Sequence, residues 1–249
     1  MTPISKVDFE QLEKPPLAGQ VALVTGSSRG IGRAIALRLA GMGCAVAICG
    51  RDKTALAGVE EELRSLVTGL FAQVADVTSA ADVEKLVHGA ESTLGPISIL
   101  VNNAGIGVFG PAHEKSEADW DRVLNTNLKS VFLVSKAVVP SMIRHGRGDI
   151  INIASLAGKN AFAGGGLYCA SKWGLRGLTA CMAEDLRGNN IRVAAIFPGS
   201  VATEFSGRGP KDATKVLTPD DVAHAVAMLV TQGPQSFLSE VDLRPLRKP

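Results

Sequence analysis

The sequence lacks any apolar run long enough to cross a membrane. A membrane-spanning helix needs about 18 or more consecutive apolar residues, and no stretch of the 249 residues reaches that length. The first residues include Lys6, Asp8 and Glu10 and contain no apolar core of signal-peptide length. We therefore expect a cytoplasmic protein that does not bind membranes.

A large excess of charge of one sign is also missing. The 26 basic and 24 acidic residues are spread along the chain and leave a formal net charge of +2. Nucleic acids and anionic membrane surfaces attract proteins that carry a broad basic field. The sequence predicts no nucleic-acid partner, and any basic pocket must be local.

Metal-ligand spacing is absent as well. The four cysteines and four histidines are scattered and form no pattern that would bring several of them to one ion. Cys44 and Cys49 lie in apolar patterns where a small hydrophobic residue would serve. We expect no metal site and reduced thiols.

No stretch rich in proline, glycine or serine divides the chain into separate domains. Apolar residues make up 46% of the sequence, which is enough for a large core. We expect a single domain over residues 18–249. Residues 1–17 are polar, end in Lys14-Pro15-Pro16-Leu17 and are predicted to form an N-terminal arm.

Short apolar runs alternate with amphipathic segments through the rest of the sequence. Strands are predicted at 21–25, 45–49, 70–75, 97–101, 149–154, 191–197 and 237–243, and helices near 30–42, 53–67, 79–93, 117–145, 166–187 and 219–232. The strands are continuous runs rich in valine, isoleucine and alanine, typical of strands buried on both faces. The pattern predicts an α/β fold: a single-domain, doubly wound parallel sheet of about seven strands with helices on both faces.

A glycine turn follows the first predicted strand. The residues Thr25-Gly26-Ser27-Ser28-Arg29-Gly30-Ile31-Gly32 come directly after Val21-Ala22-Leu23-Val24 and open the first predicted helix. Glycine permits a tight turn and a close approach of the backbone to a pyrophosphate, and the helix then aims its free N–H groups at the anion. This strand, turn and helix favour a dinucleotide site.

A second group of motifs lies further along the chain. Ser155 precedes Tyr168 by thirteen residues, and Lys172 follows Tyr168 by four, which puts Tyr168 and Lys172 on one helix face. Asn102-Asn103-Ala104-Gly105 and Pro198-Gly199 each follow a predicted strand. Ligands of such sheets bind beyond the carboxyl ends of the strands, so these motifs are expected to meet there.

In this order and at this spacing, the four motifs resemble those of the short-chain dehydrogenase/reductase family, and in particular of 3-oxoacyl-[acyl-carrier-protein] reductases. The resemblance covers about residues 18–232 and implies a Rossmann-type fold. It also implies that Asn127, Ser155, Tyr168 and Lys172 form a catalytic tetrad, with Asn127 at a local helix kink. Because a nearby positive charge favours the phenolate, Lys172 and the positive nicotinamide of the oxidised cofactor are together expected to lower the pKa of Tyr168.

The same resemblance implies a set of cofactor contacts. They are Gly26, Ser28, Arg29, Gly30, Ile31, Gly32, Arg51, Asp76, Val77, Asn103, Ala104, Gly105, Tyr168, Lys172, Pro198, Gly199, Val201 and Thr203. Within this set, Asp76 resembles a carboxylate that contacts the adenine, and capping of the helix near Ser79 is the alternative. Thr203 resembles a threonine that binds the nicotinamide carboxamide.

The end of the second strand favours NADP(H) over NAD(H). An acidic residue there would bind the ribose hydroxyls and repel a 2′-phosphate, but Gly50 takes its place and Arg51 follows. Arg51 and Arg29 offer two guanidiniums suited to a phosphate. The alternatives are that both arginines are solvated surface charges, or that Asp52 reaches the ribose.

We expect NADPH-dependent reduction of a ketone, a 3-oxoacyl thioester or similar carbonyl compound, to a secondary alcohol, with Tyr168 as proton donor. One alternative is an NAD(P)-dependent dehydrogenase of a sugar, steroid or other secondary alcohol. Another is a non-catalytic regulator that binds a dinucleotide. The intact Ser155, Tyr168 and Lys172 argue against the regulator.

The substrate side departs from the acyl-carrier-protein reductases. Only fourteen residues separate Thr203 from Thr218, which caps the next predicted helix, and Gly207, Gly209 and Pro210 among them predict a short flap. The chain also lacks a glycine-rich end, which argues against acyl-carrier specificity. The predicted mouth is apolar and consists of Ile106, Val108, Phe109, Leu156, Phe162 and Phe205.

The resemblance also implies a homo-oligomer, a dimer or tetramer, in which helices 117–145 and 166–187 pair across subunits. An apolar stripe on the second of these helices faces either a partner or its own sheet. The stripe consists of Leu175, Leu178, Met182 and Leu186. A small molecule is the other expected partner.

Overall fold

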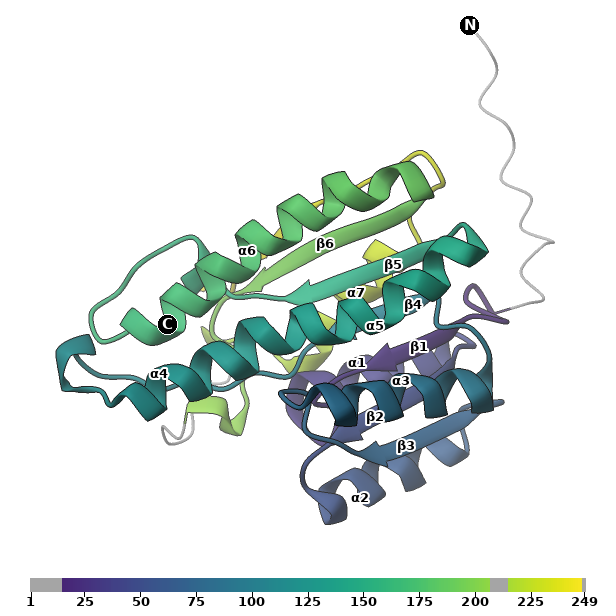
Figure 1. Cartoon of the computed structure of the whole chain (residues 1–249), viewed down its shortest axis with the longest axis horizontal. Helices are drawn as coiled ribbons and strands as arrows, with labels where there is room; N and C mark the ends of the chain where they lie inside the picture. Colours follow the sequence, from purple (N-terminus) through teal and green to yellow (C-terminus); the bar gives the residue numbers. More distant parts are fainter. Residues whose placement is uncertain (1–14, 207–214, 248–249) are drawn as a thin grey trace, which may run out of the picture.

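Seven parallel strands form one sheet in the computed structural model, which describes residues 15–206 and 215–247. The spatial order is β3-β2-β1-β4-β5-β6-β7 (Figure 1). The strands are β1 Val21–Val24, β2 Ala45–Gly50, β3 Leu70–Val74, β4 Ile99–Asn102, β5 Gly148–Ile153, β6 Ile191–Pro198 and β7 Glu240–Leu243. The chain winds outward from β1 to β3, returns to β4 beside β1, and winds outward again, which confirms the doubly wound parallel sheet.

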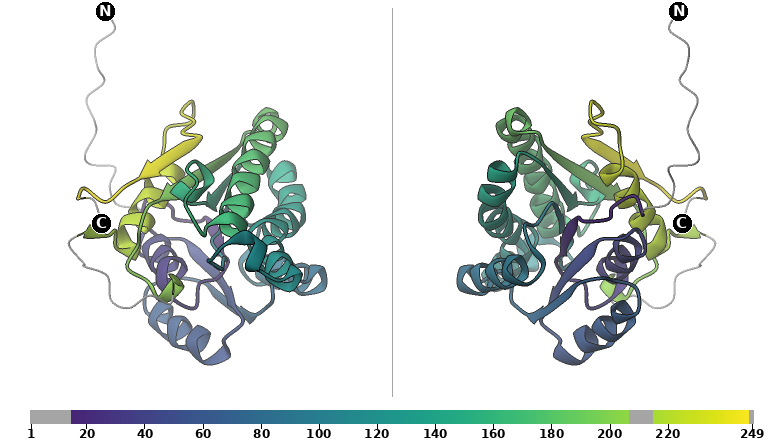
Figure 2. Two further views of the ribbon diagram at one scale, coloured as in Figure 1. Left: turned by 90° about the vertical axis from the view of Figure 1, so that its left-hand side faces the viewer. Right: turned by 90° about the vertical axis from the view of Figure 1, so that its right-hand side faces the viewer.

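Helices cover both faces of this sheet (Figures 1 and 2). They are α1 Gly30–Gly41, α2 Lys53–Arg64, α3 Ala80–Leu94, α4 Glu117–Leu124, α5 Ser130–His145, α6 Gly166–Leu186 and α7 Pro219–Val230. Helices α1, α2 and α7 share one hydrophobic core with the sheet, and α3, α5 and α6 share another.

The first strand shows why the apolar runs are continuous. Ala22 and Val24 belong to the core under α1, α2 and α7, whereas Val21 and Leu23 belong to the core on the opposite face. Successive side chains of a strand point to opposite faces, so a strand covered on both sides is apolar at every position.

The predicted helix over 117–145 is interrupted in the structure. Helix α4 ends at Leu124, and a π-helical turn, Asn125–Lys129, leads into α5. Such turns are rare and occur often at functional sites. The π-helical turn includes Asn127, the residue at which the resemblance implied a local kink. The last strand is shorter than predicted because β7 pairs with β6 only from Glu240 onward.

The described part of the predicted N-terminal arm is packed against the sheet. Leu17 is buried in the core, and its N–H donates to the carbonyl of Met42 (3.0 Å). Residues 1–14 lie outside the described residues, and the division into arm and domain stays a prediction. Within the described part of the chain, no helix is long and apolar enough to span a bilayer.

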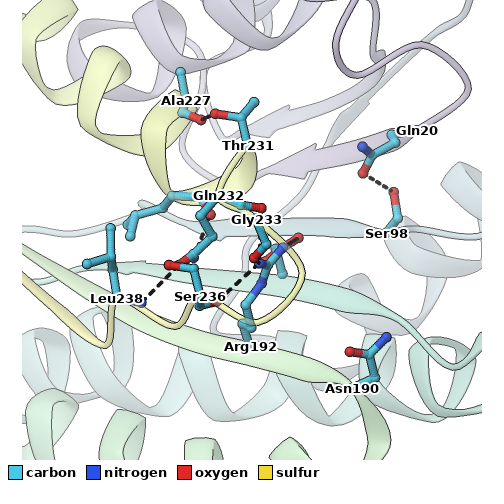
Figure 3. A network of polar contacts seen from close by, with 12 residues as sticks. Gln20, Ser98, Asn190, Arg192, Ala227, Thr231, Gln232, Gly233, Ser236 and Leu238 are labelled. Carbon is cyan, nitrogen blue, oxygen red and sulfur yellow. Dashed lines mark hydrogen bonds and ion pairs between the residues drawn. The ribbon is translucent and has the colours of Figure 1, made fainter. Parts of the chain in front are cut away.

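Arg192 fastens the loop after α7 to the amino end of the sheet (Figure 3). Its guanidinium donates to Asp149 Oδ1 (2.7 Å) and Oδ2 (3.2 Å), and also to the carbonyls of Gln232, Gly233 and Ser236. Burial raises the pKa of Asp149, and the hydrogen bonds and charge of Arg192 oppose that rise. This network holds the loop after α7 against β5 and β6.

We expect Arg192→Leu to lower the free energy of unfolding by about 3 kcal/mol, because it strands a buried carboxylate. Urea denaturation measures the change. Arg187→Leu is the matched control, since the Arg187–Glu184 pair is solvent-exposed and such pairs contribute less than about 1 kcal/mol. Equal losses in the two variants would contradict the assigned role.

Candidate active site

A cleft of about 930 Å³ opens at the carboxyl ends of the strands. Much of the predicted site lines it. These residues are Gly26, Arg29, Gly30, Ile31, Asn103, Gly105, Ser155, Tyr168, Lys172, Pro198, Gly199, Val201 and Thr203. The other predicted residues do not line the cleft. They are Ser28, Gly32, Arg51, Asp76, Val77, Ala104 and Asn127.

The glycine turn lies against the Asn103–Ala104 turn with no room for side chains. Gly26 has a φ of +63°, and a Cβ there would lie 2.8 Å from Ala104 Cα. A Cβ on Gly32 would overlap the side chain of Asn103. Gly30 also has a positive φ and approaches the methyl group of Thr203. Glycine is thus required here both by conformation and by space.

The N-terminus of α1 borders the cleft, where Arg29, Gly30 and Ile31 are lining residues. Arg29 is the N-cap residue of α1, and no side chain of the described residues caps this helix, whereas Asp52 caps α2 and Ser79 caps α3. Uncapped N–H groups and the helix dipole favour an anion at this point. The turn therefore fits the pyrophosphate of a dinucleotide.

The side chain of Asn103 holds the turn after β4 against the glycine turn after β1. Asn103 Nδ2 donates to the carbonyls of Thr25 and Gly26 (3.0 Å each), and the Thr25 hydroxyl accepts the N–H of Asn103 (3.0 Å). Asn102 is buried and donates to Asn152 on β5 (2.9 Å). The two turns are therefore positioned together at the β1/β4 junction.

The Ser155 hydroxyl and the Tyr168 phenol meet within the cleft. Ser155 follows β5, accepts the N–H of Ala157 (3.1 Å), and is hydrogen-bonded to the phenol of Tyr168 on α6. Burial raises the pKa of Tyr168 to about 12, and the hydrogen bond to Ser155 only partly offsets this. The phenol is therefore protonated at neutral pH and can donate a proton.

Lys172 lies behind this pair. Its Nζ donates to the carbonyl of Ile153 (2.8 Å) and lies 5.9 Å from the centroid of the Tyr168 ring. Burial lowers the pKa of Lys172 to about 8. The pKa of Tyr168 is raised rather than lowered in this structure, because burial of the phenol outweighs the hydrogen bond from Ser155.

Asn127 supports the cleft from outside its lining. Its side chain is fully buried and exchanges hydrogen bonds with the backbone of Ile106 (2.8 and 2.9 Å). It also donates to Ser171 Oγ (3.0 Å), which in turn donates to the carbonyl of Tyr168 (2.7 Å). The π-helical turn thus places Asn127 between the loop after Gly105 and the first turn of α6.

Gly50 ends β2 in close contact with Ser28, so a side chain at this position would require Ser28 to shift. A Cβ on Gly50 would lie 3.0 Å from Ser28 Oγ. Arg51 is exposed and has no hydrogen bond to the residues that the structure describes. Asp52 accepts the N–H of Ala55 (3.0 Å) as the cap of α2. Arg29 pairs with Glu204 (3.4 Å), and both side chains are exposed.

Asp76 closes the turn between β3 and α3. Its carboxylate accepts the N–H (2.9 Å) and hydroxyl (2.8 Å) of Thr78, and Ser79 caps the helix in its place. Burial alone would raise the pKa of Asp76, but the bonds from Thr78 and the charge of Arg51 lower it overall. Val77 is buried in the core.

The apolar mouth is only partly as predicted. Phe109, Leu156, Phe162 and Phe205 line the cleft, whereas Ile106 and Val108 do not. The flap residues Gly207, Gly209 and Pro210 lie outside the described residues. In addition to the predicted set, the lining includes Ile153, Ala154, Ala157, Asn160, Ala161, Ser200 and Glu204.

A sequence-family model described as short chain dehydrogenase matches residues 20–213. The chain belongs to this family. The 3-oxoacyl-[acyl-carrier-protein] reductase FabG of Thermotoga maritima is 35% identical over 86% of this chain and 92% of that protein. The crystal structure of a metagenomic short-chain oxidoreductase in complex with NADP is 43% identical, with a TM-score of 0.82, and the match covers 92% of this chain and 99% of that one.

Relatives of this short-chain dehydrogenase differ in length. Glycine betaine reductase ATRR of Emericella nidulans is 32% identical over 99% of this chain, but the chain spans only 20% of that protein. The family match and the relatives show that the chain is an oxidoreductase of the short-chain dehydrogenase family and has a Rossmann-type fold.

Lys159 is a supporting residue of this short-chain dehydrogenase that the sequence analysis missed. Its Nζ pairs with Glu240 (2.7 Å) and Asp242 (2.6 Å) on β7 and lies 4.1 Å from the centroid of the buried Phe197 ring. Burial would lower the pKa of Lys159, but these two carboxylates raise it. The edge strand thereby holds the loop that follows Ser155.

The raised pKa of Tyr168 predicts a titration that can be read directly, because Tyr168 is the chain's only tyrosine. At pH 10 about half of an ordinary phenol is ionised, whereas a phenol with a pKa near 12 is about 1% ionised. Between pH 10 and 12 the unfolded chain loses a proton that the folded chain keeps, so this group lowers stability as pH rises.

Tyrosinate absorbance at pH 10 measures that ionisation. We expect the native protein to show almost none, and the same protein in urea to be about half ionised. Ionisation of the native protein at pH 10 equal to that in urea, or greater, would show that Lys172 outweighs burial.

Proposed function

We propose that the chain reduces a ketone to a secondary alcohol with NADPH. The observation that carries the proposal is the contact between a protonated Tyr168 phenol and the Ser155 hydroxyl in a cleft bordered by the glycine turn. NADPH, when bound, supplies the hydride. The residues that would hold it are those of the two turns, with Lys172, Pro198, Gly199 and Thr203 along the cleft.

Three side chains stabilise the negative charge that develops on the carbonyl oxygen of the substrate. Ser155 donates a hydrogen bond to it, and Tyr168 delivers its proton to the same atom as negative charge develops there. Lys172 is largely an ammonium at neutral pH, since its pKa is about 8. Its charge stabilises the phenolate that remains after the proton has moved. Asn127 keeps the first turn of α6 in place.

The substrate is proposed to be a 3-oxoacyl thioester or a similar small carbonyl compound, a class that agrees with the name of the Thermotoga relative. Oxidation of a sugar, steroid or other secondary alcohol by NAD(P) is the alternative. It requires the ionised phenol, which the raised pKa of Tyr168 disfavours. A non-catalytic regulator would have no need of the bond between Ser155 and Tyr168.

NADP(H) is the proposed cofactor because Gly50 stands where an acidic residue would end β2, and Arg51 follows it. A guanidinium without a protein hydrogen-bond partner is suited to a 2′-phosphate. Arg29 is engaged by Glu204 and is the weaker candidate. NADP in the related metagenomic structure supports this choice.

A cytoplasmic homo-oligomer, a dimer or tetramer, is part of the proposal. The predicted stripe on α6 does not support it, because Leu175, Leu178, Met182 and Leu186 pack toward the protein's own cores. Three large side chains on α4, α5 and α6 support it instead, since each is about half exposed. They are Trp120, Phe132 and Trp173.

Tyr168→Phe tests the proton donor. We expect turnover of ketones with NADPH to fall by at least about a hundredfold, the lower end of a general acid's contribution. Cofactor affinity should stay nearly unchanged. NADPH absorbance and calorimetric titration measure the two effects, and a variant that keeps most of its rate would refute the role of Tyr168.

Arg51→Asp tests the cofactor. We expect it to weaken NADPH binding by about tenfold or more and to leave NADH binding nearly unchanged, because only NADPH carries the 2′-phosphate. Dissociation constants for both nucleotides give the ratio. Arg64→Asp is a control, since Arg64 is the last residue of α2 and pairs there with Glu60 and Glu61. Equal weakening of both nucleotides by Arg51→Asp would remove the phosphate-site argument.

A further inference from the structure

Two phenylalanine rings contact the ring of Tyr168, and a third packs beside one of them. The ring of Phe109 meets the Tyr168 ring edge to face, with 5.5 Å between the ring centroids. The ring of Phe205 also contacts the Tyr168 ring, with 5.8 Å between their centroids. Phe162 extends the group, 6.2 Å from Phe109. All three line the cleft, and we call Phe109, Phe162 and Phe205 the aromatic frame.

Two glycines make space for the aromatic frame. A Cβ on Gly107 would lie 2.7 Å from the Phe109 ring and 3.0 Å from the Phe205 ring. A Cβ on Gly165 would lie 2.6 Å from the Phe162 ring. Each ring therefore rests directly on a backbone without a side chain, so the frame is a closely packed feature of the cleft.

Part of the aromatic frame remains uncovered at the mouth. Phe162 is 49% exposed and Phe205 is 44% exposed, although both are large apolar side chains. Apolar surface gathered in a cleft is typical of a ligand site. The charged side chains among the described lining residues are engaged elsewhere: Arg29 pairs with Glu204, and Lys172 donates to Ile153.

We propose that the substrate carries an aromatic ring on its carbonyl carbon, and that Phe109 and Phe205 bind this ring while the carbonyl oxygen faces Ser155 and Tyr168. The inference rests on the proposed function, and it narrows the substrate class to aryl ketones. Aromatic pairs attract each other through their quadrupoles beyond the burial of apolar area. A saturated ring of the same size buries a similar area and lacks that attraction.

The test compares acetophenone with cyclohexyl methyl ketone. Each is titrated calorimetrically into the protein saturated with NADP⁺, a state in which neither ketone can be reduced. Two favourable ring pairs predict that acetophenone binds about tenfold more tightly. Equal affinity for the two ketones, or tighter binding of the saturated one, would overturn the proposal without reference to any variant.

Variants of the aromatic frame test which rings cause the preference for acetophenone. Phe109→Leu and Phe205→Leu should each reduce the affinity ratio by about threefold or more. Phe237→Leu is the control, since Phe237 precedes β7 at the opposite, amino edge of the sheet and is not a lining residue. Circular dichroism verifies that each variant folds, and an unchanged ratio in both folded frame variants would remove the assignment.

Turnover separates this inference from the proposed function. NADPH consumption with acetophenone as substrate supports both. Preferential binding of acetophenone without consumption of NADPH by any ketone would refute the reductase proposal and leave the aromatic site standing. Reduction of both ketones with no preference in binding would support the reductase proposal and refute the aromatic site.

Discussion

The close approach of two backbone turns is the constraint on which the site depends. Gly26 lies against Ala104, and the side chain of Asn103 bridges the carbonyls of Thr25 and Gly26. The contact joins the two halves of the sheet where the strand order reverses, between β1 and β4. A dinucleotide crevice forms at such a junction because the helices that follow the two strands leave on opposite faces. The order of the strands therefore determines where the cleft lies, and the catalytic side chains do not.

Burial shifts the pKa values of two titratable groups that line the cleft in opposite directions. It raises the pKa of Tyr168 and lowers that of Lys172, since desolvation disfavours an anion in one case and a cation in the other. The outcome is a neutral phenol beside an ammonium that is easily deprotonated. A donor that holds its proton until charge develops on a neighbouring oxygen is suited to reduction, and the buried cation then stabilises the anion that is left.

Much of the fold could be predicted because its signals are local. Continuous apolar runs identify strands buried on both faces, and the glycine turn together with the spacing of Ser155, Tyr168 and Lys172 identifies the cleft. The π-helical turn was harder, since helical periodicity does not show a single inserted residue, and only the resemblance pointed to Asn127. Lys159 was missed because its partners, Glu240 and Asp242, are far away in sequence and belong to a short edge strand. Asp52 and Asp76 were ambiguous because a carboxylate near a helix start can serve the backbone or a ligand, and the structure shows both bonded to backbone N–H groups.

The position of β7 has a consequence for biosynthesis. Lys159 ties the loop after Ser155 to this strand, and the N–H of Gly199 donates to the carbonyl of Leu243 (2.8 Å), so both sides of the cleft are fastened to residues near 240. A nascent polypeptide emerging from the ribosome can form β1 to β6 without them. It cannot complete its catalytic centre until β7 has been translated, so products that stop before Glu240 are expected to be inert even where their Rossmann core has already formed.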